Sequence, residues 1–277
     1  MKTVGVSYHP KNQAAPFVAE KTVALLKELG VETWMVSAWD SEELRRQASG
    51  ADLIITVGGD GTILRTANAV IPGSACIAGI NLGRLGFLTE ISTEDTGEKI
   101  PALVRGEGWI DERTLLEAEL TLPGTEENAK RRFVALNDVV VARGEVTRII
   151  HIETRVNGDL LTTYRADGVI LATATGSTGY ALAAGGPVLY PSSKDFLLVP
   201  ILPHLGLNYN MVLPADSEVQ LQIINTHVAA LNIDGHISCS LPDGASITIR
   251  RSPHTIRFLR ALPKTTFYNT IEKRLKV

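Results

Sequence analysis

The 277-residue sequence contains only two cysteines, Cys76 and Cys239, and neither belongs to a Cys-x-x-Cys pair. A disulfide framework is therefore not expected, and the pattern is typical of a protein in the reducing cytosol. The six histidines show no paired ligand spacing, so the sequence predicts no metal site built from protein side chains. We expect a cytoplasmic protein.

The sequence also has no large excess of charge. The formal net charge is -3 at pH 7, which gives no reason to expect nucleic acid or an acidic membrane surface as a partner. The first ten residues lack the apolar core of a signal peptide. The apolar run 196–203 is too short and too rich in proline to span a bilayer. We expect a protein that binds neither nucleic acid nor a membrane.

In the first part of the chain, strand-like and helix-like segments alternate. Apolar strand-like segments are found at residues 4–7, 31–37, 52–57 and 76–80. Segments with helical spacing or helix-capping residues lie between them and after the last one. This alternation predicts a Rossmann-like α/β domain over residues 1–105, with a parallel sheet and helices on both of its faces. In such sheets, ligands bind beyond the carboxyl ends of the strands.

After residue 105 the pattern changes to a period of two. Leu116, Ala118 and Leu120 alternate with polar residues, which is typical of antiparallel strands with one buried face. The pairs Asn157-Gly158 and Asp243-Gly244 predict hairpin turns. Residues 106–258 are therefore predicted to form an antiparallel β-sandwich domain. Residues 259–277 are expected to be partly helical and to return to the α/β domain.

The segment Gly58-Gly-Asp-Gly-Thr62 lies between a buried strand and a helix. Its glycines free the backbone N–H groups and remove Cβ atoms, and the helix begins at the same point, so the turn suits a phosphate. Neither the G-x-G-x-x-G fingerprint nor the P-loop pattern is complete here. Asp60 has two interpretations: its carboxylate acts on a metal or a reacting hydroxyl, or it caps the helix. Turn chemistry alone leaves both open.

Small and hydroxyl-bearing residues gather again at 173–180, after an apolar strand that begins near Asp167. Such a segment can bind ribose or phosphate, or it can form a tight corner. The polar pair Asn137-Asp138 interrupts an apolar run, and residues 232–236 contain polar residues that need an explanation in the same way. Each of these either faces a site or marks a bulge, a strand end or a turn. Because both predicted domains carry a glycine-rich turn beside an aspartate, the binding interpretation is favoured.

Six motifs, taken in order, resemble the motif set of the NAD kinase family. They are Gly58–Thr62, Asn81–Leu88, Asn137-Asp138, Asp167-Gly168, Thr173–Tyr180 and Gly185–Pro187. The first motif alone also resembles lipid kinases and phosphofructokinases, but the ordered series spans nearly the whole chain and is specific. The resemblance implies transfer of the terminal phosphate of ATP, or of polyphosphate, to the 2′-hydroxyl of the adenosine ribose of NAD, which gives NADP. It also implies Mg²⁺ or another divalent cation with the donor, and a homodimer or homotetramer.

The resemblance implies roles for individual residues as well. Asp60 corresponds to the catalytic aspartate of the family. The glycine-rich turn provides the expected phosphate-binding residues Gly58, Gly59, Gly61 and Thr62. The expected NAD-binding residues are Asp60, Gly61, Arg65, Asn137, Asp138, Arg148, Arg165, Asp167, Thr178, Gly179, Tyr180, Ala181, Leu182, Ala183 and His236.

The sequence departs from the family pattern at several positions. Ala174 and Gly179 replace the proline and the alanine of Thr-Pro-Thr-Gly-Ser-Thr-Ala-Tyr. Residues 205–210 replace a segment that commonly has serines and an Arg-Pro pair, and His236 stands where glutamine is common in bacterial members. Since Gly179 loosens the backbone, we expect it to affect NAD affinity more than activity.

Two alternatives remain at this stage. A lipid or sugar kinase could share the glycine-rich turn, but Asn137-Asp138 and the region of Thr178 do not fit an apolar substrate channel. A non-catalytic sensor of NAD(H) or NADP(H) could share the whole scaffold. The intact Asp60 disfavours the sensor.

Overall fold

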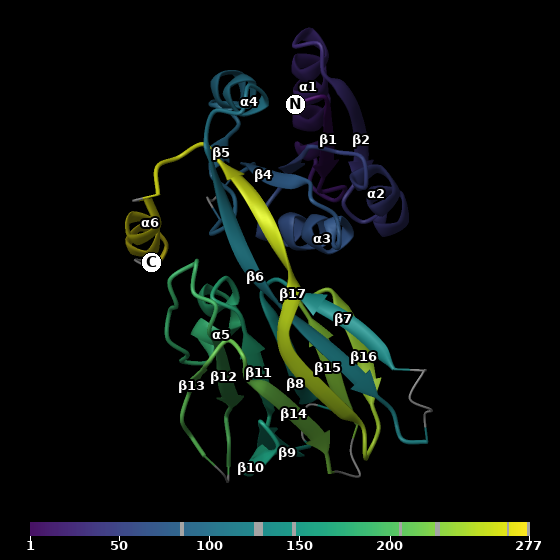
Figure 1. Cartoon of the computed structure of the whole chain (residues 1–277), viewed down its shortest axis with the longest axis vertical. Coiled ribbons are helices and arrows are strands. Elements are labelled where there is room, and N and C mark those ends of the chain that lie inside the picture. Colours follow the sequence, from purple (N-terminus) through teal and green to yellow (C-terminus); the bar gives the residue numbers. More distant parts are fainter. Residues whose placement is uncertain are drawn as a thin grey trace. The chain divides into compact units, whose positions relative to one another are not determined.

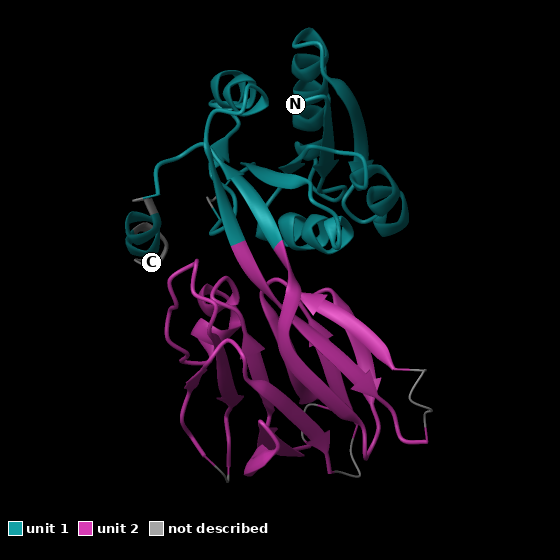
Figure 2. Ribbon diagram, viewed as in Figure 1, with its two compact units in different colours: residues 1–112, 256–277 teal, residues 113–255 magenta. Residues whose placement is uncertain are grey.

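The structure is a computed structural model that describes residues 1–83, 86–124, 130–145, 148–204, 207–224, 228–264 and 266–275. The chain divides into two compact units (Figure 2): unit 1 comprises residues 1–112 and 256–277, and unit 2 comprises residues 113–255. Two long strands, β6 (Trp109–Thr121) and β17 (Ser246–Arg260), continue from one unit into the other. The unit boundaries lie inside these strands, which is why they differ from the boundaries predicted from sequence.

Unit 1 contains a parallel sheet in the order β17-β4-β3-β1-β2, and β5 pairs with β4. The strands other than β17 are β1 (Thr3–Tyr8), β2 (Glu32–Ser37), β3 (Leu53–Val57), β4 (Cys76–Asn81) and β5 (Ile91–Ser92). The helices are α1 (Ala15–Glu28), α2 (Ser41–Ala48), α3 (Asp60–Val70), α4 (Thr96–Val104) and α6 (Thr266–Leu275). The predicted α/β class is confirmed.

Strands β1, β2, β3 and β4 of this sheet end almost level with one another. Tyr8 of β1 pairs with Ser37 of β2 and with Val57 of β3, and Val57 pairs with Ile80 of β4. Because the strands are parallel, the loops that follow them emerge at one edge of the sheet. The glycine-rich turn after β3 and the loop after β4 are therefore neighbours.

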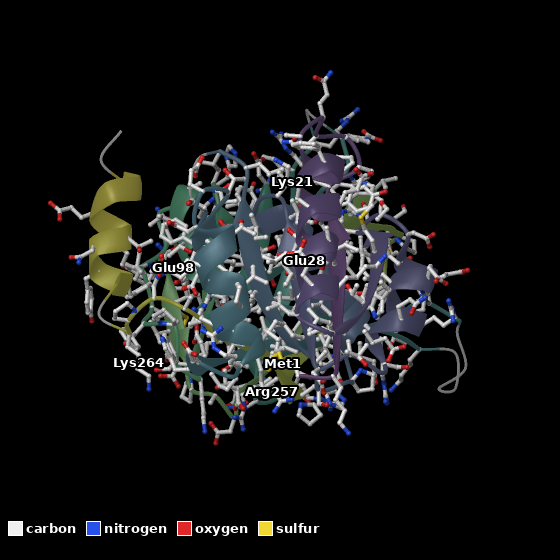
Figure 3. The ribbon with its side chains drawn as sticks, turned by 90° about the horizontal axis from the view of Figure 1, so that it is seen from above. Met1, Lys21, Glu28, Glu98, Arg257 and Lys264 are labelled. Atoms are coloured by element: carbon white, nitrogen blue, oxygen red, sulfur yellow. The ribbon has the colours of Figure 1, made fainter. Side chains whose placement is uncertain are left out.

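Helices cover both faces of this sheet, with α1 and α4 on one face and α2 and α3 on the other (Figure 1). Viewed from above, α1, which carries Lys21 and Glu28, lies beside α4, which carries Glu98 (Figure 3). Two helix ends show the capping that their residue types favour. The Asp40 side chain accepts the Glu43 N–H at 3.2 Å where α2 begins, and Gly30 adopts φ +73° after α1. None of the helices in the described part of the chain is long and apolar enough to cross a membrane.

Unit 2 is a sandwich of two antiparallel sheets, as predicted. One sheet has the order β13-β12-β11-β8-β15-β16, and the other contains β10-β9-β14-β17 together with β6 and β7. The strands of the first sheet are β13 (Met211–Leu213), β12 (Phe196–Ile201), β11 (Gly168–Ala172), β8 (Asp138–Arg143), β15 (Ala229–Ile233) and β16 (Ile237–Leu241). Those of the second, besides β6 and β17, are β10 (Asp159–Ala166), β9 (Ile150–Val156), β14 (Glu218–Ile223) and β7 (Arg131–Ala135).

Alternating residues of the two sheets form the core of the sandwich. Val219, Leu221 and Ile223 of β14 are buried together with Val139 and Val141 of β8. The predicted Asn157-Gly158 hairpin joins β9 to β10, and both of its residues have positive φ. Between β7 and β8 the chain passes from one sheet to the other, and the Asn137-Asp138 pair lies at that passage.

Candidate active site

The glycine-rich turn of unit 1 is built by close contact between the backbone and Thr62. Every residue of β3 is buried, and Gly58 follows with φ +156°, a conformation that L side chains rarely adopt. A Cβ atom on Gly58 would overlap the Thr62 hydroxyl, so only glycine fits. Gly59 is the N-cap of α3, and Asp60 is the first helical residue.

The Asp60 carboxylate binds three consecutive backbone N–H groups of the loop after β4. Oδ2 accepts the Phe87 N–H at 2.7 Å, and Oδ1 accepts the N–H groups of Leu88 at 3.0 Å and Thr89 at 3.3 Å. Gly86 makes room for this arrangement, because a Cβ there would overlap the carboxylate. The helix-capping interpretation of Asp60 is wrong, since its side chain makes no capping bond to α3. The Asp60 side chain instead connects the Gly58–Thr62 turn to the Asn81–Leu88 motif through hydrogen bonds. The sequence did not predict this contact.

The surroundings of Asp60 differ between its two sides. Gly59 and Gly61 are exposed, and a Cβ on either would meet no atom within 4 Å. Thr62 is buried, and its Oγ1 has no hydrogen-bond partner among the described residues. The half-buried Arg65 guanidinium lies 4.3 Å from the centre of the Trp39 ring. The turn therefore has open backbone at Gly59 and Gly61 and a cation one helical turn further on.

Unit 2 contains a pocket of about 430 Å³ that brings several predicted residues together. It is lined by Asn137, Asp138, Val140, Ala142, Tyr180, Asn232, Asp234 and Gly235. Three of these, Asn137, Asp138 and Tyr180, are expected NAD-binding residues. The Asp138 side chain is only 7% exposed and has no hydrogen-bond partner among the described residues. Burial, and next to it the Asp234 charge, raises the pKa of Asp138 to about 7.

Asp234 is the residue of this pocket whose importance the sequence did not reveal. Its carboxylate accepts the N–H groups of Leu136 at 2.8 Å, Asn137 at 2.7 Å and Asp138 at 3.1 Å. Burial raises the pKa of Asp234 to about 6, although these three bonds act in the opposite direction. The sequence leaves residues 232–236 open to two interpretations, a binding site or a turn, and no local pattern connects Asp234 with residues about a hundred positions earlier.

The hydroxyl-rich segment after β11 bonds mainly to backbone. Thr173 Oγ1 donates to Leu136 O at 2.6 Å, and Ser177 Oγ donates to Ala174 O at 2.6 Å. Thr178 Oγ1 donates to Thr175 O at 3.2 Å. The segment therefore forms a tight corner, which is one of the two interpretations that the sequence allows. It also places Tyr180 at the pocket. Gly179 has φ -100° and ψ -127°, a combination outside the main regions allowed to L-residues, so glycine suits this position.

The structure places the remaining predicted NAD-binding residues outside the set that lines this pocket. Arg148 and Arg165 are exposed, and Asp167 pairs with Arg143 at 3.1 Å. Ala181 packs in a small apolar cluster with Val140. Leu182 is half-buried and Ala183 is exposed, both on the short helix α5 (Tyr180–Ala183). His236 Nδ1 lies 3.1 Å from Asp234 O, beside the pocket.

Some residues of the quoted motifs lie outside the described part of the chain. These are Arg84 and Leu85 of the Asn81–Leu88 motif and Leu205 and Gly206 of the 205–210 segment. Among the described residues, no group of three or more histidine, cysteine, aspartate or glutamate side chains could hold a metal ion. A second pocket, of about 520 Å³, lies in unit 1 beside α1, and none of the predicted site residues line it.

Comparison with known proteins gives the same assignment along the whole chain. Residues 8–108 match the family model of the ATP-NAD kinase N-terminal domain, and residues 136–261 match that of the C-terminal domain. An NAD kinase of Dehalococcoides mccartyi is 48% identical over 99% of this chain and 96% of the relative. An NAD kinase of Chloroflexus aurantiacus is 37% identical over 100% of this chain and 99% of the relative.

Two solved structures are similar as well. The NAD kinase of Archaeoglobus fulgidus in complex with ATP has a TM-score of 0.77 and 29% identity, and the match covers 99% of both chains. Yeast NADH kinase complexed with NADH shares the fold, with a TM-score of 0.87 and 24% identity over 99% of this chain and 87% of that chain. The chain belongs to the NAD kinase family and is an enzyme of that family.

Proposed function

We propose that the enzyme transfers the terminal phosphate of ATP, or of polyphosphate, to the 2′-hydroxyl of the adenosine ribose of NAD and releases NADP. The observation that carries the proposal is the Asp60 carboxylate, which is half-buried at the start of α3 and fixed by three backbone N–H groups. The ATP bound to the Archaeoglobus fulgidus relative supports a nucleoside triphosphate as donor.

Phosphoryl transfer depends more on positioning and charge stabilisation than on a strong base. In the proposed step, Asp60 accepts a hydrogen bond from the 2′-hydroxyl and takes its proton as the oxygen bonds to phosphorus. The bond between that phosphorus and the bridging oxygen of the donor breaks, and ADP or a shortened polyphosphate leaves. The exposed backbone at Gly59 and Gly61, where α3 begins, suits the donor phosphates. Thr62 is less accessible than its predicted phosphate-binding role requires, because its side chain is only 1% exposed.

A divalent cation, Mg²⁺ in the first instance, is proposed to enter with the donor. When bound, it neutralises charge on the phosphate oxygens. Both oxygens of Asp60 already accept N–H bonds, and the described residues form no carboxylate or histidine cluster. This donor set fits a cation that is coordinated mostly by phosphate oxygens and water.

We further propose that the pocket of unit 2 binds the adenosine part of NAD. The buried carboxyl of Asp138 and the amide of Asn137 are hydrogen-bonding groups that an adenine amino group and ribose hydroxyls can satisfy. The roles of Arg65, Arg148, Arg165, Asp167, residues 178–183 and His236 toward NAD rest on the family resemblance. A homodimer or homotetramer and a cytoplasmic location also rest on the resemblance and on the cysteine pattern.

The test is NADP formation from NAD with Mg-ATP and, separately, with Mg-polyphosphate, measured through a dehydrogenase that requires NADP. We expect product with at least one donor, and the two rates rank the donors. Binding of NAD without product from either donor would overturn the proposal and favour the sensor. Product that lacks a 2′-phosphate would overturn the proposed acceptor hydroxyl.

A further inference from the structure

Asp234 makes more hydrogen bonds to the Asn137-Asp138 segment than a turn residue needs. It begins the hairpin turn between β15 and β16, where Asp234 has φ +51° and Gly235 has φ +68°. Asp234 is 6% exposed, and its carboxylate accepts three N–H bonds from residues 136–138. Its own N–H donates to Asp138 O at 3.0 Å. Four hydrogen bonds therefore connect this turn to one short segment.

That segment cannot satisfy its own backbone. Strand β7 ends at Ala135 and β8 begins at Asp138, so Leu136 and Asn137 lie outside both ladders. Buried N–H groups without a partner are strongly unfavourable, and here Asp234 is their acceptor. Thr173 secures the opposite side of the same backbone, because its Oγ1 donates to Leu136 O at 2.6 Å and its N–H donates to Asn137 O at 2.9 Å.

Because hydrogen bonds hold both edges of this backbone, the side chains of Asn137 and Asp138 have little freedom to change direction. Asn137 and Asp138 both line the 430 Å³ pocket, and Asp234 lines it beside them. Asn232 and Tyr180 are the other polar side chains of the lining, and His236 approaches Asp234 O from its own turn. Asp234 and Asp138 are the only carboxyl groups among the lining residues.

We propose that Asp234 is a positioning residue for NAD binding: its carboxylate holds Asn137 and Asp138 in the orientation that binds the adenosine part of the dinucleotide. The inference rests on the proposed function, which assigns NAD to this pocket. Asp234 acts through the segment it holds and does not contact the reacting atoms. It therefore affects the ground state and the transition state equally, and the effect of a mutation appears in KM more than in kcat.

The first experiment compares Asp234→Asn with wild type. The amide keeps the shape of the side chain but loses the charge and one acceptor, so the three N–H groups can no longer all be satisfied. We expect the Kd for NAD, measured by calorimetry without donor, and the KM for NAD to rise roughly tenfold. We expect kcat at saturating NAD and donor to stay within about threefold of wild type.

Asp243→Asn is the matched control, because Asp243-Gly244 is another Asp-Gly turn of unit 2. This turn connects β16 to β17 of the other sheet, so the hairpin predicted there from sequence is wrong. Its Kd and KM should equal those of wild type. The second readout is pH. Since the Asp234 charge contributes to the raised pKa of Asp138, Asp234→Asn should move the midpoint of the pH profile of NAD binding to lower pH. Asp234→Glu keeps the charge and should keep that midpoint, even if its affinity is reduced.

Urea unfolding of each variant shows whether Asp234→Asn is folded under the assay conditions. If it is not, Thr173→Val removes the hydrogen bond from the Thr173 hydroxyl to Leu136 O on the other side of the same segment. This variant should show the same rise in KM at nearly constant kcat. An unchanged Kd in Asp234→Asn, or a fall in kcat at unchanged KM, overturns the inference. If the wild-type enzyme forms no NADP, or if Asn137→Ala binds NAD as tightly as wild type, the proposed function itself fails, whatever Asp234→Asn does.

Discussion

Each unit contains an aspartate that binds three consecutive backbone N–H groups of a segment distant in sequence. In unit 1, Asp60 Oδ2 accepts one N–H of residues 87–89 and Oδ1 accepts two. In unit 2, Asp234 Oδ2 accepts one N–H of residues 136–138 and Oδ1 accepts two. The α/β unit and the β-sandwich thus use the same hydrogen-bonding pattern.

The two aspartates differ in burial. Asp234 is 6% exposed, and burial raises its pKa to about 6 despite the three N–H bonds. Asp60 is half-buried, at the first position of a helix beside two open glycines. Three N–H bonds fix the carboxylate in both places, but Asp60 is the less buried of the two. The comparison teaches that one hydrogen-bonding pattern suits two proposed roles: Asp60 acts on the reacting hydroxyl, and Asp234 holds a neighbouring segment of the protein.

The largest expected effect is that of Asp60→Asn on turnover. The amide cannot accept a proton from the 2′-hydroxyl, so kcat should fall at least about 100-fold, the lower range for loss of a general base. The amide oxygen can still accept N–H bonds from the loop after β4, so the variant should remain folded. Steady-state NADP formation and urea unfolding measure the two effects separately.

Asp52→Asn is the matched control for that prediction. The Asp52 carboxylate also binds backbone N–H groups, those of Lys2 at 2.6 Å and Thr3 at 3.1 Å, but it precedes β3 and lies at the opposite edge of the sheet from Asp60. Its turnover should equal that of wild type. If Asp60→Asn retains full turnover, Asp60 has no part in the chemical step and the contrast with Asp234 disappears.

The second prediction concerns Asp138, the buried carboxyl beside Asp234. Because the pKa of Asp138 is raised to about 7, the folded state binds this proton more tightly than the unfolded state does. The contribution of Asp138 to stability is therefore largest below about pH 4 and is lost as the pH rises to about 7. Asp138→Asn removes the buried charge, so its advantage over wild type in the free energy of unfolding should grow from near zero at pH 4 to at most about 4 kcal/mol at pH 8.

Urea unfolding of wild type and Asp138→Asn at pH 4.5, 6, 7 and 8 measures this difference. A difference that does not change with pH would show that Asp138 titrates normally and that the pocket of unit 2 is more hydrated than its burial indicates. Asp138→Asn should also weaken the pH dependence of NAD binding, because one of the two buried carboxyls no longer titrates.

Much of the fold follows from local patterns in the sequence. The capping residue Asp40, the Asn157-Gly158 turn and the alternating residues of β14 each specify an element through neighbours a few positions away. The family motifs point to Asp60 and Asn137-Asp138, whose roles stay predictions. The two-unit division was also visible in the change of period near residue 106, although the unit boundaries lie inside long strands.

The hydrogen bonds that hold the candidate site could not be predicted in this way. Asp60 lies 27 positions from Phe87, and Asp234 lies 98 positions from Leu136. Such contacts depend on which strands end beside one another in the sheet and on where the chain passes from one sheet to the other. Neither feature produces a periodic pattern in the sequence. An aspartate before a glycine looks the same whether it caps a turn or anchors a distant segment.

The third prediction tests the segment that Asp234 holds. A Cβ on Gly176 would lie 2.5 Å from the carbonyl carbon of Asn137 and would overlap its oxygen, and backbone cannot move aside easily. Gly176→Ala should lower the free energy of unfolding by about 1–3 kcal/mol, as overpacking does elsewhere. Gly50→Ala is the control, because a Cβ there meets no atom within 4 Å and its φ is not positive. Its stability should change by less than about 0.5 kcal/mol.

The smallest expected effect is the corresponding change in unit 1, Gly86→Ala. Its Cβ would overlap the Asp60 carboxylate, but here the obstacle is the end of a side chain, which can rotate away. Stability should therefore fall by less than about 1 kcal/mol, whereas kcat should fall roughly tenfold because the carboxylate leaves its three N–H donors. Gly83→Ala, in the same loop and with open space around its Cβ, should match wild type in both. A Gly86→Ala variant with lowered stability and unchanged kcat would show that the N–H bonds of Asp60 serve the fold alone, as those of a purely structural aspartate would.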